Sequence, residues 1–469
     1  MTKSIEREVM RHHKNSFKVL NTINQMRYQK MNFLKFIFSL LFVSISFFVK
    51  AQNPIVKDFG MADPHVYIFN EKAYLFSTRD ADSTATHFIM PDWHIWSSDD
   101  LVNWKHEREI NPSETYMGEG STRCWATETA TKNGKFYFYF SNGNDDTGVM
   151  VADQPEGPYK DALGKPLLDK NLTPGKEYDP TVLMEDDGTA YIVFGHLASK
   201  EISLRYYIAE LGEDMISLKE APKVLVFNKK DGFYNDKPNL HKRNGIYYLS
   251  AGSLYATSDN IYGPYNFVGN SGDGHYGLTG QAHGNYFTWE NQWFHTWTKF
   301  YIDPKIKFRE SYMTYLHYKD NGDMVDDVNF LEKHFAIGIG RYDANWDKIQ
   351  AEWYMKAEGI EKKESPNGGF EIQNIKNNGN LFYPNVSNLS DKESISFCVS
   401  SVDEGIIEIR DKNETGRVLG TCKIKNTGGW ELHKNFTCDL DNLTGVNDIC
   451  FVFKGKSKDV LHLDWFSFK

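Results

Sequence analysis

Acidic residues recur at intervals along the first two-thirds of the chain, each beside an apolar segment with strand-like alternation. Asp63, Glu128, Asp179 and Asp236 each open such a segment, which is followed by a turn and a second segment with paired aromatics, and His283 opens a fifth copy. Two carboxylates, one acting as general acid and one as general base, can hydrolyse a glycosidic bond. Carboxyl groups held close together also drive their pKa values apart, as that division of roles requires.

The five copies are separated by 65, 51, 57 and 47 residues. Repeats of roughly 50 residues that contain several strands are typical of β-propellers, whose repeats pack against their neighbours. We call Asp63, Glu128, Asp179, Asp236 and His283 the anchors of the five repeats. If each anchor begins the innermost strand of its repeat, the five anchors form one ring at one end of a central channel. A single Asp at a strand start is often only a turn cap, but equivalent acids in successive repeats favour a shared site. The sequence therefore predicts an all-β fold with a five-bladed β-propeller.

Bulk composition narrows the function classes. The chain has 469 residues, which favours two or more domains. Aromatic residues make up 15% of it; they suit strands and the core of an all-β protein, and they also suit stacking on sugar rings. The formal net charge of −10 argues against a nucleic-acid partner or an anionic membrane, because no basic face is available for phosphates.

The N-terminus has the pattern of an export signal. A short basic stretch from Met31 precedes an apolar run over residues 36–49 and a small residue at Ala51. This run is short for a membrane span, so we interpret residues 1–51 as an upstream extension plus a signal peptide that starts at Met31, with an uncleaved anchor helix as the alternative. No Cys follows the run, which argues against a lipoprotein anchor. We expect a periplasmic or secreted protein with no membrane partner after signal removal.

Cysteine spacing gives no metal motif. None of the five cysteines forms a CxxC pair, so a zinc site is not expected. Four of them fall in the last 75 residues, where either disulfides or buried free thiols are compatible with the spacing.

The repeats resemble glycoside hydrolase family 43, a family of arabinofuranosidases and β-xylosidases with a five-bladed propeller. The similar segments are Asp63-Pro64-His65, WSSDDLVNW over residues 96–104, and DPTV followed by DDGTAY over residues 179–191. The resemblance covers about residues 54–340, and we assign residues 54–342 to this domain. It implies an inverting hydrolase in which Asp63 is the general base and Asp179 orients the general acid and tunes its pKa.

One position departs from the family pattern. Asp236-Lys237-Pro238 stands where the family has Glu-Ala/Gly-Pro, with the Glu as general acid. Three interpretations follow: Asp236 is the acid of a subgroup, Glu128 takes over, or the enzyme is impaired. We prefer the first, because Asp236 matches the acid by its place in the repeat. The side chains assigned to substrate binding in the propeller are Glu128, Trp125, His283 and Arg309, with His283 resembling the family's axial histidine.

The last part of the chain, residues 346–469, resembles carbohydrate-binding module family 6. The matching segments are AE at residues 351–352, TGGW ending at Trp430, and DWF beginning at Asp464. The resemblance implies a β-sandwich of jelly-roll type, with Trp430 stacking on sugar, and a structural calcium with Glu352 and Asp464 as candidate ligands. His462 replaces the family's ligand-binding Asn, so a purely structural role is the alternative.

Together these features predict an exo-acting, inverting glycosidase that removes a terminal furanose or pentose from polysaccharide side chains, of α-L-arabinofuranosidase, β-D-xylosidase or galactofuranosidase type. The partner is a polysaccharide or oligosaccharide, and the chemistry needs no cofactor. Two alternatives stay open, an endo-acting arabinanase-like propeller and a sugar-binding propeller without catalysis. We also expect residues 341–350 to be a linker, so that a chain ending near Tyr342 folds alone.

Overall fold

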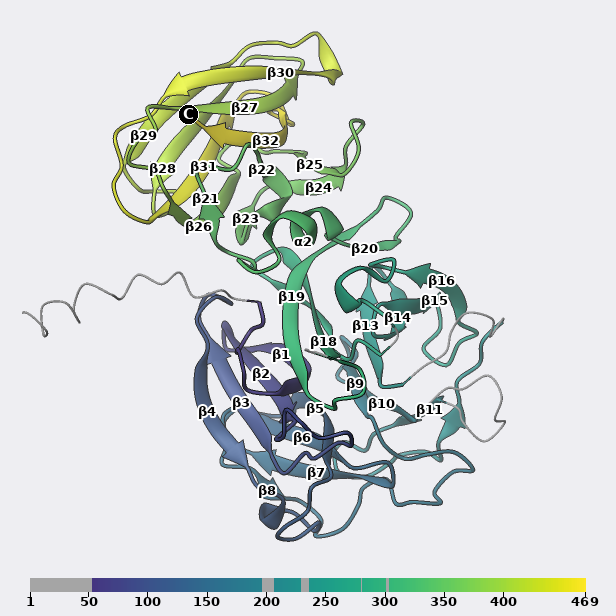
Figure 1. Ribbon diagram of the computed structural model, residues 1–469. Coiled ribbons are helices and arrows are strands. Elements are labelled where there is room, and N and C mark those ends of the chain that lie inside the picture. The colour runs from purple at the N-terminus through teal and green to yellow at the C-terminus, as the bar shows by residue number, and fades with distance from the viewer. Residues whose placement is uncertain (1–52, 196–205, 229–235, 280, 301–302) are drawn as a thin grey trace, which may run out of the picture. The chain divides into compact units, whose positions relative to one another are not determined.

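The computed structural model describes residues 53–195, 206–228, 236–279, 281–300 and 303–469 (Figure 1). These residues are predominantly β-strands, with one α-helix, α2 (Val328–His334), and short 3-10 turns among the described elements. Residues 1–51, which carry the expected signal peptide, lie outside the described residues. No helix in the described part of the chain is long and apolar enough to cross a membrane.

Residues 61–326 form five antiparallel sheets of four strands each, and the strands of each sheet are consecutive in the described chain (Figure 1). The first two sheets comprise β1 (Met61–Phe69), β2 (Lys72–Arg79), β3 (Trp93–Ser98) and β4 (Lys105–Ile110), then β5 (Cys124–Lys132), β6 (Lys135–Asn142), β7 (Asp146–Ala152) and β8 (Lys160–Asp161). The third and fourth comprise β9 (Thr181–Met184), β10 (Ala190–Gly195), β11 (Tyr206–Glu210) and β12 (Lys223–Val224), then β13 (Pro238–Arg243), β14 (Ile246–Ala251), β15 (Leu254–Ser258) and β16 (Asn266–Asn270). The fifth comprises β17 (Tyr286–Trp289), β18 (Gln292–Phe300), β19 (Arg309–Tyr318) and β20 (Met324–Asp326).

Turn chemistry explains why each repeat opens with a hairpin. In four of the five repeats both turn residues have positive φ: Asn70-Glu71, Asn133-Gly134, Asn244-Gly245 and Glu290-Asn291. Two consecutive left-handed residues make the turn that matches the right-handed twist of paired strands. The third repeat differs, because β9 and β10 are joined by the longer segment 185–189, in which Gly188 alone has positive φ.

The first strands of the sheets lie next to one another. β1 contacts β5 and β17, and β9 contacts β5 and β13. The fourth and fifth sheets meet through aromatic side chains, with Tyr248 and Tyr255 packing against Tyr318 and Met324. Each sheet therefore contacts the next, and the fifth contacts the first, so residues near the N-terminal ends of these strands can gather in one place.

The C-terminal part of the chain is a sandwich of two sheets. One sheet has the order β21-β26-β31-β28-β29, with β23 beside β26, and the other has the order β24-β25-β32-β27-β30, with β22 beside β32. The strands are β21 (Tyr342–Asp343), β22 (Ile349–Gln350), β23 (Lys356–Glu358), β24 (Glu361–Glu364), β25 (Phe370–Gln373), β26 (Asn380–Ser387), β27 (Ser394–Ser401), β28 (Gly405–Asp411), β29 (Val418–Ile424), β30 (Gly429–Asp439), β31 (Asn447–Gly455) and β32 (His462–Phe468). All five cysteines are free thiols.

The segment expected to be a linker is part of the sandwich. β21 pairs with β26 and β22 pairs with β32, so residues 342–350 already contribute to both sheets. The apolar core also continues through this region, because Trp353 packs against Phe330 of α2 and belongs to the same buried cluster as Tyr315 of β19. Its indole Nε1 donates a hydrogen bond to Asp327. The linker expectation is therefore wrong, and the reason is that the strand pairs begin earlier than the alternation in the sequence indicates.

Because this core is shared, we expect Trp353→Ala to lower the free energy of unfolding of the whole chain by about 3–5 kcal/mol, the cost of truncating a buried Trp. Urea unfolding followed by intrinsic fluorescence and by activity measures the change. Leu432→Ala is the matched control, because Leu432 is 53% exposed and its truncation should change the free energy by less than about 0.5 kcal/mol. If the variant loses the sandwich at low urea while the first 340 residues unfold at the wild-type midpoint, the shared core carries no stability.

Candidate active site

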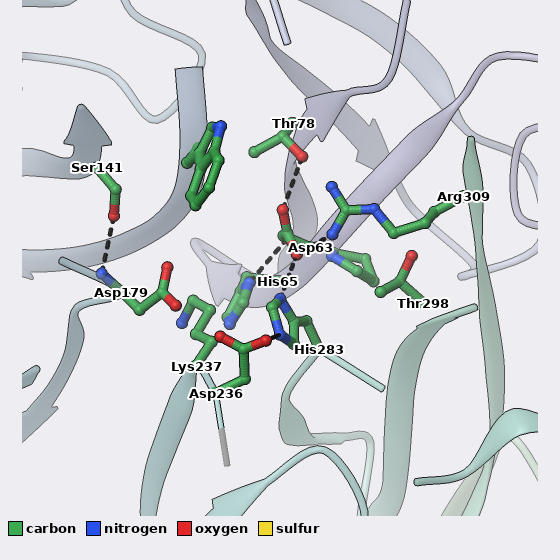
Figure 2. A network of polar contacts seen from close by, with 12 residues as sticks. Asp63, His65, Thr78, Ser141, Asp179, Asp236, Lys237, His283, Thr298 and Arg309 are labelled. Atoms are coloured by element: carbon green, nitrogen blue, oxygen red, sulfur yellow. Dashed lines mark hydrogen bonds and ion pairs between the residues drawn. The ribbon is translucent and has the colours of Figure 1, made fainter. Parts of the chain in front are cut away.

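A cavity of 250 Å³ is lined in part by residues that precede or begin the first strands of the sheets. Six of the residues singled out in the sequence line it: Asp63, Trp125, Asp179, Asp236, His283 and Arg309. Most of them come from different sheets, so the repeats bring together side chains that are far apart in the chain (Figure 2). The cavity is therefore the place where the predicted ring of anchors converges.

Asp63 reaches the cavity because its strand is irregular there. The register of β1 against β2 shifts between Ala62 and His65, which is a β-bulge at the Asp63-Pro64 dipeptide. Asp63 has φ 50°, and Asp179, which also precedes a proline, has φ 57°. Left-handed backbone at a residue other than glycine carries strain and concentrates at functional sites, and bulges commonly re-aim a side chain beside an active site.

Three side chains hold the Asp63 carboxylate. Thr78 donates a hydrogen bond to Oδ2 at 2.8 Å, while His283 Nδ1 and Arg309 Nη1 lie 2.6 Å and 3.1 Å from Oδ1 (Figure 2). Burial alone would raise the pKa of Asp63, but the positive charges of Arg309 and His283 hold it well below its ordinary value. Asp63 is therefore an ionised carboxylate at any pH near neutrality.

Arg309 is fixed by a second carboxylate, that of Asp80. Its Nε and Nη2 donate to the two oxygens of Asp80 at 2.9 Å and 3.0 Å, a two-point contact that sets the plane of the guanidinium. Asp80 is fully buried and follows β2. Sequence reasoning missed this residue; its one available signal is that an acid follows directly on a strand of buried residues.

His283 joins the expected base to the expected acid. Its Nδ1 faces Asp63, and its Nε2 lies 3.3 Å from Oδ2 of Asp236 (Figure 2). Burial would lower the pKa of His283, but the carboxylates of Asp236 and Asp63 raise it to about 10, so the ring is an imidazolium at neutral pH. One ring spans the two carboxyl groups, which places them no farther apart than the roughly 6.5–9.5 Å of an inverting pair. The expected convergence of Asp63 and Asp236 is thus found in the structure.

Asp179 lies beside this pair. Its backbone N–H donates to Ser141 Oγ at 2.9 Å, which ties the start of the third repeat to β6. Burial, and after it the charge of Asp236, raises the pKa of the Asp179 carboxyl well above its ordinary value. Asp236 itself accepts a hydrogen bond from Tyr206 at its backbone carbonyl, at 2.6 Å. The backbone of each acid is therefore fixed by a hydrogen bond to a neighbouring side chain.

Glu128 is not where the repeat pattern predicts it. It lies in the middle of β5 rather than before the strand, is fully buried, and is not among the residues that line the cavity. Its Oε1 accepts hydrogen bonds from Tyr67 and from the Thr129 backbone N–H. Trp125, near the start of the same strand, lines the cavity instead of Glu128. The expectation that Glu128 belongs to the ring of five residues at the cavity is wrong, because the similar sequence segments are offset in the second repeat.

The module's aromatic candidate is covered on one side. His462 stacks on Trp430 with a centroid distance of 4.2 Å and an interplanar angle of 17°. Burial would lower the pKa of His462, but hydrogen bonds to Asp459 and Glu371 raise it to about 9. A protonated imidazole therefore backs one face of the Trp430 ring, an arrangement that a cation–π attraction stabilises.

The expected calcium ligands show a partial fit. Glu352 is buried and its Oε2 has no hydrogen-bond partner among the described residues, which suits a hard cation. The charge of Asp464 helps to raise the pKa of Glu352. The two residues do not, however, belong to a group of three acidic, His or Cys side chains in the described part of the chain that could share an ion. In the described part of the chain the one such group is Asp92, His94 and Glu109, where Arg79 already pairs with Asp92. A calcium ion on Glu352 is therefore a proposal, which metal analysis of the purified chain tests.

Comparison with known proteins agrees with the resemblance seen in the sequence. The family model for glycosyl hydrolases family 43 matches residues 51–288, and the model for the family 6 carbohydrate binding module matches residues 350–469. An arabinoxylan arabinofuranohydrolase of Paenibacillus polymyxa is 27% identical over 89% of this chain and 74% of its own length. A β-D-galactofuranosidase of Aspergillus niger is 32% identical over 46% of this chain and 66% of its own length.

Among solved structures, a family 43 arabinoxylan arabinofuranohydrolase of Bacillus subtilis, crystallised with cellotetraose, covers 90% of this chain and 98% of its own. The TM-score is 0.52 at 23% sequence identity, so this likeness concerns the fold. The family match covers half of the chain, and it includes the segments that carry Asp63, Asp179 and Asp236. The chain therefore belongs to glycosyl hydrolase family 43 and is an O-glycosyl hydrolase that carries a family 6 carbohydrate binding module.

Proposed function

We propose that the protein is an exo-acting, inverting glycosidase that removes a single terminal furanose or pentose from the side chains of a plant-type polysaccharide such as arabinoxylan. The observation that carries this proposal is the small site: one 250 Å³ cavity with Asp63 and Asp236 joined across it by His283. Pockets for drug-sized ligands measure about 300–1,000 Å³, so this volume suits one sugar ring rather than a chain. The names of the relatives, arabinofuranohydrolases and a galactofuranosidase, support the same substrate class.

The role of Asp63 follows from its charge, and the role of Asp236 follows from its place in the repeat. Asp63, ionised and aimed into the cavity, takes a proton from the attacking water as that water adds to the anomeric carbon. Asp236, which must enter this step in its protonated form, gives its proton to the leaving oxygen on the other side of the scissile bond, and the configuration inverts. Arg309, fixed by Asp80, and Trp125 form the wall that holds the sugar. Asp179 holds Asp236 in position and interacts with it electrostatically.

We also propose that the five described sheets are the five blades of a closed propeller, since each sheet contacts the next and the fifth contacts the first. The cavity then lies at one end of its axis. An endo-acting arabinanase-like function is less favoured, because a groove open at both ends would be needed and this cavity is small. Export to the periplasm or the medium fits a polysaccharide substrate that cannot enter the cell.

A panel of nitrophenyl glycosides tests the function directly. We expect hydrolysis of an α-L-arabinofuranoside, a β-D-xyloside or a β-D-galactofuranoside, release of single sugars from arabinoxylan, and an inverted configuration of the product by proton NMR. Asp63→Asn should reduce the rate by at least about 10²–10⁴-fold, because it removes the general base. Release of oligosaccharides as the first products would refute exo action, and a wild type inactive on every member of the panel would refute the substrate class.

The assignment of the general acid has its own test. Asp236→Asn should slow hydrolysis of glycosides with poor leaving groups by about 10²–10⁴-fold while sparing activated aryl glycosides, whose leaving oxygen needs little protonation. Glu128→Gln serves as the comparison, because Glu128 is buried outside the cavity and its loss should affect both substrate types alike. The opposite pattern would make Glu128 the acid.

For the module, we propose that sugar stacks on the face of Trp430 that His462 leaves free. Trp430→Ala should then abolish retardation of the protein in a gel that contains arabinoxylan, since stacking aromatics supply most of the contact area in such sites. Leu432→Ala, an exposed apolar change on the same strand β30, is the control and should keep wild-type retardation. Equal retardation of both variants would assign the module a structural role.

A further inference from the structure

Lys237 is a lysine with almost no access to solvent. It lies between Asp236 and the first residue of β13, and only 2% of its surface is exposed. An ammonium group is very rarely buried unless it is paired, because removal from water costs several kcal/mol. The position therefore requires a compensating set of acceptors and negative charges.

The acceptors are two backbone carbonyls. Lys237 Nζ donates to Pro180 O at 2.9 Å and to Pro238 O at 3.4 Å. Pro180 directly follows Asp179, and Lys237 directly follows Asp236, so this side chain ties the backbone behind one acid to the backbone behind the other. Figure 2 shows Lys237 lying between the Asp179 and Asp236 side chains.

The charges come from three neighbouring repeats. Glu128 of β5 is the strongest electrostatic partner of Lys237, followed by Asp179 and by Asp63 of β1. Glu128 is fully buried, and its Oε2 has no hydrogen-bond partner among the described residues. Burial raises the pKa of the Glu128 carboxyl and the charge of Lys237 opposes that rise. His65 also faces the ammonium, and burial together with this positive charge lowers the pKa of His65.

We propose that Lys237 is a positioning residue for the reaction. Its ammonium fixes the spacing of Asp179 and Asp236, and its positive charge stabilises the ionised forms of the buried acids around it. Glu128 is its main counter-charge. This inference rests on the proposed roles of Asp179 and Asp236. It also gives Glu128 a function that does not need contact with the substrate.

The test compares Lys237→Met, which keeps the length of the side chain but removes its charge, with Lys237→Arg, which keeps the charge. Loss of a nearby cation raises the pKa of a carboxylic acid, and an acid catalyst stays active up to its pKa. We therefore expect the alkaline limb of the pH profile of kcat to move up by about one pH unit in Lys237→Met and to stay in place in Lys237→Arg. The profile is measured on the full chain with a glycoside that has a poor leaving group.

Lys242→Met is the matched control, because Lys242 lies on β13, the strand that Lys237 directly precedes, is partly exposed and pairs with Glu185 away from the cavity. It should leave the pH profile unchanged. A Lys237→Met variant with a lower kcat and an unmoved alkaline limb would show that Lys237 is only structural and would overturn the proposal. A wild type without glycosidase activity would instead refute the proposed function.

A double-mutant cycle on stability tests the interaction of Lys237 with Glu128 and needs no measurement of activity. We expect Lys237→Met and Glu128→Gln each to destabilise the chain, and the double variant to be more stable than the sum of the two changes by about tenfold or more in the unfolding equilibrium constant. If Lys237→Met alone does not fold, recovery of folding in the double variant supports the pairing. Additive effects, or a double variant that also fails to fold, would overturn it.

Discussion

The buried guanidinium of Arg309 is the contact on which the catalytic arrangement depends. It stands at the start of β19 in the fifth sheet and binds Asp80 and Asp63, which belong to the first repeat. The same group therefore joins the last sheet to the first, fixes the plane of the cavity wall and keeps the base ionised. A buried ion pair of this kind adds little net stability, but the loss of either partner leaves an uncompensated charge.

The other acids of the site also face positively charged side chains. Asp63, Asp179 and Asp236 line one cavity, and Glu128 is buried away from it. Arg309, the His283 imidazolium and Lys237 face these acids from other strands. The pKa of Asp63 is lowered, whereas burial raises the pKa of Asp179 and of Glu128, so these neighbouring carboxyl groups differ in their affinity for protons. That difference is what acid–base hydrolysis needs.

Much of the fold could be predicted from the sequence because it is local. Hairpin turns with Asn, Gly or Glu at left-handed positions are set by two residues each, and they occur in four of the five repeats. The site was predictable where a residue precedes a first strand, as for Asp179, Asp236 and His283. Glu128 was misplaced because sequence similarity between repeats does not fix register within a strand. Asp80 and Lys237 were missed because pairing across repeats, and not their local sequence, explains why they are buried.

The core shared by the fifth sheet and the sandwich has a consequence for modular exchange. Carbohydrate-binding modules are commonly treated as appendages that can be moved between enzymes. Here Trp353 lies against α2, and Gln292 of β18 donates hydrogen bonds to the backbone carbonyls of Glu352 and Tyr354. Excision of the module would expose this apolar surface and leave a buried amide unpaired. A chimera that joins another binding module to this catalytic domain therefore needs the segment around residues 349–357 to come with the enzyme.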